Sequence, residues 1–89
     1  MLSVNDMEYL DTLREKECIC VEKPTERVYS IHMSHGRVEL RSGHKLYKVK
    51  EIEIKTNGKY SFKATCKEIG ADIETIKVFR LTAYKKVKT

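Results

Sequence analysis

Three cysteines and three histidines are the side chains of this 89-residue chain that could serve as nucleophile, base or metal ligand. They are Cys18, Cys20, Cys66, His32, His35 and His44. A thiolate activated by a nearby imidazole is the minimal nucleophile–base pair. Nothing in the sequence places an oxyanion donor beside such a pair, and no glycine-rich phosphate loop, G-x-S-x-G or H-E-x-x-H motif occurs. The sequence therefore predicts a protein that is not an enzyme.

Thiolate and imidazole are also zinc ligands. One pairing of the first two expected strands would place Cys18, Cys20 and His32 on the same face, with Cys18 across from His32. A structural zinc site needs four ligands. The candidates for the fourth are Glu39, His44 and Cys66. Because the paired C-x-x-C spacing is absent, the alternative is favoured: the cysteines are small buried hydrophobes, and His32 pairs with Glu39 at the surface. We expect no metal and no cofactor.

The cysteine pattern and the hydropathy also suggest a compartment. Three cysteines form an odd set, and Cys18 and Cys20 are too close in sequence for an ordinary disulfide, so reduced thiols are expected. No apolar stretch approaches the ~18 residues of a membrane span. The segment 1–6 has neither a positive region nor an apolar run, unlike a secretory signal. The expectation is a cytoplasmic protein that does not contact a membrane.

The charge of the chain is divided along its length. Residues 1–26 carry seven acids against three bases, a net charge of −4, and residues 27–89 carry fifteen bases against six acids, a net charge of +9. A basic body favours an anionic partner, of which nucleic acid comes first. The acidic N-terminal segment either is simply solvated, contacts a partner protein, or repels nucleic acid and so orients the basic surface.

Basic side chains that alternate along strands, with exposed aromatic rings among them, are typical of proteins that hold phosphates and stack bases. We therefore predict a nucleic-acid-binding surface. Its residues are Lys48, Lys50, Lys63, Lys77, Arg80, Lys85 and Lys86, with Tyr47 and Tyr84 as stacking groups. The competing interpretation is that these lysines are the solvated face of ordinary strands.

A function of another class fits the same composition. The chain could be a protein–protein interaction or inhibitor module, of the kind found as accessory proteins of viruses or mobile elements, that binds an acidic partner protein. Pairing through an edge strand would be the natural mode for a small antiparallel sheet. A homodimer through that edge is compatible with either function.

The elements that must position these residues begin with a helix over residues 3–16. Asn5 is the expected N-cap, because Glu8 follows it at the spacing of a capping box. An apolar stripe at helical spacing should pack on the sheet. Its members are Val4, Met7, Leu10 and Leu13.

Beyond the helix the apolar period changes to two, which predicts strands over Cys18–Glu22, Val28–Ser34 and 37–41. A two-residue turn at His35-Gly36 would pair Met33 with Val38 and Ile31 with Leu40. The same register pairs His32 with Glu39 and Ser30 with Arg41. Apolar meets apolar and polar meets polar, so this register is self-consistent.

A second hairpin surrounds Asn57-Gly58, and its register can be tested in the same way. A two-residue loop would scramble the faces, whereas the three-residue loop 56–58 pairs Ile54 with Tyr60, Ile52 with Phe62 and Glu51 with Lys63. The alternation breaks upstream, which predicts a bulge or bend near Val49 or Lys50.

The last element covers residues 74–84 and is apolar on both faces, which indicates a central strand that the helix covers; a C-terminal helix is the alternative. The predicted fold is a single α+β, mostly β, domain over residues 1–89. It consists of a helix at 3–16 packed on an antiparallel sheet at 17–84, either open or a half-open barrel of about five strands, followed by a basic tail at 85–89.

Overall fold

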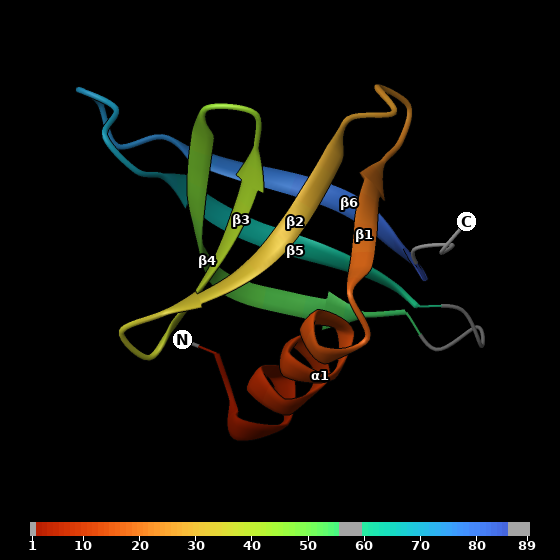
Figure 1. Cartoon of the computed structure of the whole chain (residues 1–89). Helices are drawn as coiled ribbons and strands as arrows, with labels where there is room; N and C mark the ends of the chain where they lie inside the picture. The colour runs from red at the N-terminus through yellow and green to blue at the C-terminus, as the bar shows by residue number, and fades with distance from the viewer. Residues whose placement is uncertain (1, 56–59, 86–89) are drawn as a thin grey trace.

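Six antiparallel strands form a closed barrel, and one helix covers an end of it (Figure 1). The computed structural model describes residues 2–55 and 60–85. The elements are α1 (Val4–Glu15), β1 (Cys18–Glu22), β2 (Val28–Ser34), β3 (Arg37–Ser42), β4 (Lys45–Ile54), β5 (Ser61–Glu68) and β6 (Ile76–Lys85). Each strand pairs with the next in the chain, and β6 returns to pair with β1. Among the described residues, no helix has the length and apolar character needed to cross a bilayer.

The mostly β content and the N-terminal helix are confirmed, but the open or half-open sheet of about five strands is wrong. Five residue pairs join β1 to β6, from Cys18 opposite Lys85 to Glu22 opposite Leu81. These partners stand about sixty residues apart in the chain, so no local turn signals their pairing. Closure gives every strand two neighbours and removes the edges that an open sheet would expose.

The helix begins at a capping box, although not at the predicted residue. The Ser3 hydroxyl accepts from the Asp6 amide at 3.1 Å, and the Asp6 carboxylate accepts from the Ser3 amide at 3.4 Å. Ser3 is therefore the N-cap and Asn5 lies in the first turn. Ser3 and Asn5 are both residue types that favour the N-cap. The two reciprocal hydrogen bonds between Ser3 and Asp6 favour Ser3 over Asn5.

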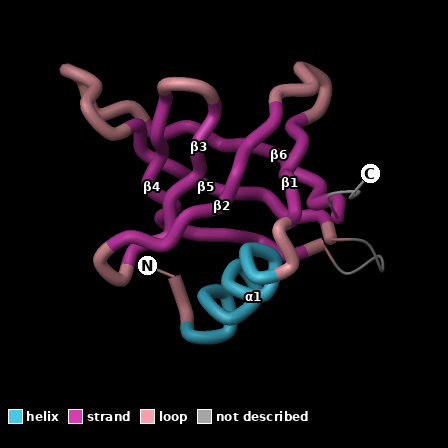
Figure 2. Tube along the Cα trace, in the orientation of Figure 1, coloured by secondary structure: helices cyan, strands magenta, loops and turns pink. Residues whose placement is uncertain are grey.

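The inward face of α1 seals one end of the barrel (Figure 2). Leu10 and Leu13 are 0% and 1% exposed, and Met7 packs partly against the same core. Val4 is 74% exposed, so its place in the predicted apolar stripe is wrong.

The β2–β3 hairpin has the predicted register. Met33 lies opposite Val38, Ile31 opposite Leu40 and His32 opposite Glu39. His35 and Gly36 both have positive φ, 51° and 74°, as a two-residue turn between twisted strands requires.

The β4–β5 hairpin confirms the predicted bulge, which lies between Val49 and Glu51. Its register is two residues from the predicted one, because Ile54 lies opposite Phe62 and Ile52 opposite Ala64. A shift of two keeps the same side chains on the same face, so the apolar pattern does not distinguish the two registers. The predicted turn residues 56–58 lie outside the described residues.

The strand β6 is confirmed, but the helix does not cover it. Phe79, Leu81 and Ala83 point into the barrel, whereas Ile76 and Val78 are about half exposed on its outer surface. The helix packs mainly against β1 and β2. β6 is apolar on both faces, and its outer face has no covering element among the described residues.

The helix seal generates a stability prediction. Leu10→Ala should lower the free energy of unfolding by about 2–5 kcal/mol, because it removes buried methyl groups and leaves a cavity. Val4→Ala, on the same helix, is the matched control and should change it by less than about 0.5 kcal/mol. Urea unfolding followed by circular dichroism measures both. Equal losses in the two variants would contradict the described packing.

Candidate nucleic-acid interface

The three cysteines point into the barrel and belong to its core. Cys20 lies opposite Tyr29, and Cys18, Cys20 and Cys66 are all buried. His32 lies on the outer face, where its imidazole is 2.9 Å from the Ser30 hydroxyl. The arrangement that would have placed Cys18, Cys20 and His32 together is therefore wrong, because the strand register separates them across the sheet. No cluster of three metal-ligating side chains occurs in residues 2–55 and 60–85.

Burial also makes the core thiols poor nucleophiles. It raises the pKa of Cys20 from its ordinary 9.0 to about 12, and it raises the pKa of Cys66 to about 12. A neutral thiol is neither an effective nucleophile nor a metal ligand. Both cysteines therefore act as small apolar core residues.

Two of the predicted site residues close the end of the barrel opposite the helix. Tyr47 is 1% exposed, and its ring centroid is 4.9 Å from that of Phe79. The Lys77 ammonium lies 5.8 Å from the Tyr47 ring centroid, so it covers this aromatic cluster. The predicted stacking role of Tyr47 is wrong because its ring is part of the core.

Tyr29, which is also buried, completes this end. Its hydroxyl donates to a Glu22 carboxylate oxygen at 2.9 Å. Burial is the largest cause that raises the pKa of the Tyr29 hydroxyl, followed by its hydrogen bond to Glu22. The aromatic rings at this end are therefore neutral and enclosed.

Lys63 and Arg80 are cross-strand neighbours on the outer face of β5 and β6. The Lys63 ammonium is 4.0 Å from a Glu53 carboxylate oxygen, which offsets part of its charge. Arg80 borders a shallow hollow of about 160 Å³ together with Lys23 and Lys55. This part of the predicted surface is basic, although an acid lies within it.

The remaining predicted residues lie elsewhere. Tyr84 is about half exposed on the outer face and lies opposite Ile19 of β1. Lys85 ends β6, and Lys86 lies outside the described residues. In the strand order of the barrel, the β6–β1 seam is opposite the β3–β4 seam. The eight predicted residues that the structure describes therefore do not form one surface.

The structure does bring Lys48 and Lys50 together, and it adds Arg37. These three side chains border a hollow of about 430 Å³ between the start of α1, the β2–β3 hairpin and the bulge of β4. Its other lining residues are Leu2, Met7, Gly36, Val38 and Val49. We call it the cationic hollow, because three bases and no acid are among its described lining residues.

A second hollow adjoins the first. It measures about 360 Å³ and is lined by the same Arg37, Lys48 and Lys50, together with Lys67, Glu68, Glu74 and residues 69–71 of the β5–β6 loop. We call it the loop-side hollow. Three bases therefore lie on the border that the two hollows share.

The acids near this border are engaged with particular bases. Glu74 pairs with Lys67, and the hydrogen bond from Lys67 is the largest cause that lowers the pKa of the Glu74 carboxyl. Glu39 is mostly buried and lies 4.0 Å from the Arg37 guanidinium. The pairs of Glu39, Glu68 and Glu74 are with Arg37, Lys45 and Lys67, and the Lys50 charge also helps to lower the pKa of the Glu74 carboxyl. Lys48 and Lys50 are therefore the bases on this border that make no direct ion pair with Glu39, Glu68 or Glu74, and they are the best placed of the three to meet an external anion.

Arg37 was missed by the sequence reasoning, although a signal existed. Ser42 pairs with Lys45 across a two-residue turn, and Glu39 pairs with Lys48. Continuing that register sets Arg37 beside Lys50. The pairing test that succeeded for β2–β3 would have found Arg37 had it been applied to Gly43-His44. No sequence signal indicated that Leu2 and Met7 would line this hollow, because the angle at which α1 packs on the barrel is set by tertiary contacts.

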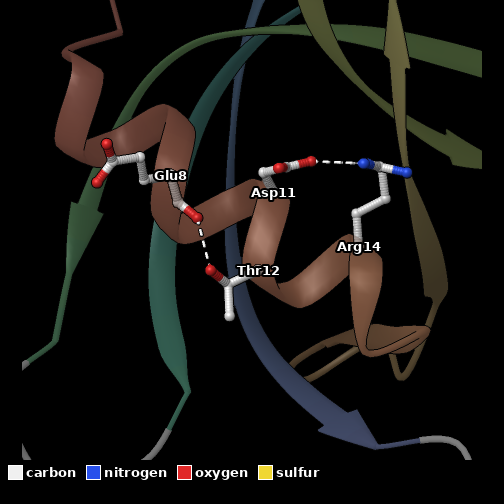
Figure 3. A network of polar contacts seen from close by, with 4 residues as sticks. All are labelled: Glu8, Asp11, Thr12 and Arg14. Carbon is white, nitrogen blue, oxygen red and sulfur yellow. Dashed lines mark hydrogen bonds and ion pairs between the residues drawn. The ribbon is translucent and has the colours of Figure 1, made fainter.

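The acidic outer face of the helix is partly neutralised within the helix itself. The Nε and Nη2 atoms of Arg14 donate to the same Asp11 carboxylate oxygen, at 2.9 and 2.6 Å, and Figure 3 shows the two side chains pointing toward each other. The Thr12 hydroxyl donates to the Glu8 backbone carbonyl at 2.8 Å, and the Glu8 carboxylate points away from this network. The exposed acids Glu8 and Glu15 therefore keep the outer face of α1 negative.

Comparisons of this chain with protein-family models, curated proteins and solved structures found no significant match. The geometry and charge of the two hollows are therefore the basis for a functional proposal.

The buried thiols generate a labelling prediction. In the native protein at pH 8, Cys20 and Cys66 should react with a chromogenic thiol reagent only as fast as the barrel opens, because they are buried and protonated. Full reactivity should appear in denaturant. Rapid native labelling of either thiol, located by peptide mass spectrometry, would refute this placement.

The same thiols predict an alkaline loss of stability. Their native pKa values lie above the ordinary 9.0, so the unfolded chain loses these protons at lower pH than the native one. The free energy of unfolding should therefore fall as pH rises from about 9 toward 12. Urea midpoints at successive pH values measure this fall. Cys66→Ala should show a shallower decline than the parent, and an identical slope would contradict the prediction.

Proposed function

We propose that this protein is a non-enzymatic module that binds nucleic acid through phosphates held at Arg37, Lys48 and Lys50. One observation carries the proposal: three bases from two neighbouring strands border a hollow whose described lining residues include no acid. A basic protein can spread its charge evenly over its surface for solubility alone. Bases that gather around one hollow instead indicate a binding site for an anion.

The chemistry of the three cations suits a phosphodiester. The Arg37 guanidinium presents a planar set of donors that matches phosphate oxygens, and the two lysines act as mobile point charges. Such contacts release condensed counterions, so affinity depends steeply on salt. Lys67 continues the row of bases onto the loop-side hollow, although its pair with Glu74 offsets part of its charge.

The basic residues on the outer face of β5 indicate the path that a bound nucleic-acid strand would take. Lys63, Thr65 and Lys67 alternate on that face, and Arg80 lies beside Lys63. A backbone that leaves the shared border past Lys67 would next meet Lys63 and Arg80. Glu53, which pairs with Lys63, makes this second position weaker than the first.

The proposal is tested by fluorescence anisotropy with labelled single-stranded and duplex oligonucleotides at about 50 and 200 mM salt. Affinity should fall steeply across that range. Lys48→Gln should lower affinity for every sequence and reduce the slope of log affinity against log salt by about 1. Salt-independent binding, or no binding at low salt, would refute the proposal.

Lys16→Gln is the matched control. It also removes one positive charge, but at the C-terminal end of α1, whereas the cationic hollow lies beside the start of this helix. The helix has 12 residues and is therefore about 18 Å long, with Met7 near its start and Lys16 at its C-cap. Lys16→Gln should leave the salt slope unchanged. An equal effect of the two variants would show that net charge, and not the cationic hollow, sets the affinity.

A second function, binding of a protein partner, is favoured by the outer surface of β6. Ile76 and Val78 are about half exposed there, with Lys67 opposite Ile76, and Ile73 in the loop before β6 is 75% exposed. The predicted mode is wrong, because closure leaves none of the six strands with a free edge for pairing with a partner or a second copy. A partner would therefore have to dock on the outer face of the barrel.

A further inference from the structure

We infer that the two hollows hold consecutive nucleotides of a single strand, with the phosphate that joins them on Arg37, Lys48 and Lys50. The base on one side of that phosphate would enter the cationic hollow and rest against Met7 and Val49. This inference rests on the proposed function, since it specifies which form of nucleic acid the same site takes.

The shared border is the first supporting observation. The same three cations line both hollows, so an anion bound there has a cavity on each side. In a single strand, each phosphate is flanked by two sugar–base units. In a duplex the bases are paired and stacked inside, and they are not available to enter a protein pocket without unstacking.

The lining of the cationic hollow is the second observation. Its volume of about 430 Å³ falls within the range of small-ligand sites. Leu2, Met7, Val38 and Val49 give it an apolar floor. A thioether makes favourable contacts with aromatic rings, and bases stack on guanidinium planes in single-strand recognition. The described lining of the hollow has no aromatic residue on which a base could stack. The Met7 thioether and the Arg37 guanidinium therefore provide the two surfaces that a base would contact.

The bulge of β4 is the third observation. Val49 pairs with Cys66 and Glu51 pairs with Thr65, so Lys50 is the extra residue that has no partner on β5. A bulge redirects a side chain, and bulges are frequent next to functional sites. Here the bulge places Lys50 on the shared border, and Val49 remains buried in the floor.

An acyl chain with a carboxylate head would also combine an anion with an apolar group, but it fits this site less well. The barrel interior is filled by Tyr29, Tyr47, Phe62 and Phe79, so the hollow does not continue into a tunnel. A long chain would leave much of its length in water. A flat base is small enough to be covered by the apolar floor and the Arg37 guanidinium alone.

The test compares three labelled probes of equal length: oligothymidylate, the same backbone with abasic sites, and a duplex. Abasic and base-bearing strands carry the same number of phosphates, so their salt slopes should agree. The abasic strand should bind about tenfold more weakly at each salt concentration, since base contacts are lost. The duplex should also bind more weakly than oligothymidylate.

Met7→Gln separates the base contact from the phosphate contact. It should weaken binding of oligothymidylate severalfold and leave the abasic strand unchanged. Val4→Gln is the control on an exposed position of the same helix and should change neither. Unfolding midpoints of both variants establish that they are folded.

The outcomes distinguish the inference from the function on which it rests. If none of the probes binds with salt dependence, the proposed function fails. If all three bind with equal affinity and Met7→Gln acts on none of them selectively, phosphate binding stands and the base pocket is refuted. Tighter binding of the duplex than of oligothymidylate would also refute it.

Discussion

The pairing of β1 with β6 is the constraint on which the rest of this structure depends. Five residue pairs join the first strand to the last and turn a meander of hairpins into a barrel. Closure removes the exposed edges that make small sheets prone to pair with other chains. It also creates an interior with two ends, each of which must be covered. Leu10 and Leu13 of the helix cover one end, and the aromatic cluster of Tyr29, Tyr47 and Phe79 covers the other.

A filled interior leaves the outer surface as the place where this barrel can recognise a partner. In small barrels the inward-facing positions are occupied by side chains, and here they include all three cysteines. The reactive groups that a sequence reader notices first are therefore used for packing. The proposed recognition site depends instead on irregularities of the outer wall. The bulge of β4 and the start of α1 both line the cationic hollow.

The charge of this protein shows why net charge is a weak guide to a surface. The strands carry many lysines, but Glu53, Glu68 and Glu74 lie near Lys63, Lys45 and Lys67 in turn. Local pairs of this kind contribute little to stability at an exposed surface. They do lower the local potential, and so they select which part of a basic surface remains available. At the border of Arg37, Lys48 and Lys50, Glu39 lies 4.0 Å from Arg37, so the two lysines supply most of the available charge there. The position of this border follows from strand register.

The sequence by itself determined the local structure: the helix, the strand positions, the β2–β3 register and the bulge near Val49. Each of these depends on neighbours in the chain, through turn chemistry and the alternation of apolar residues. The tertiary structure decided the β1–β6 closure, the burial of Tyr47 at one end with Lys77 over its ring, and the convergence of Arg37 with Lys48 and Lys50. The tertiary structure also decided the β4–β5 register, since a shift of two residues leaves the apolar side chains on the same face. These features join residues distant in sequence, and the alternating pattern carries no record of which strand becomes a neighbour or on which side of a barrel a lysine will lie.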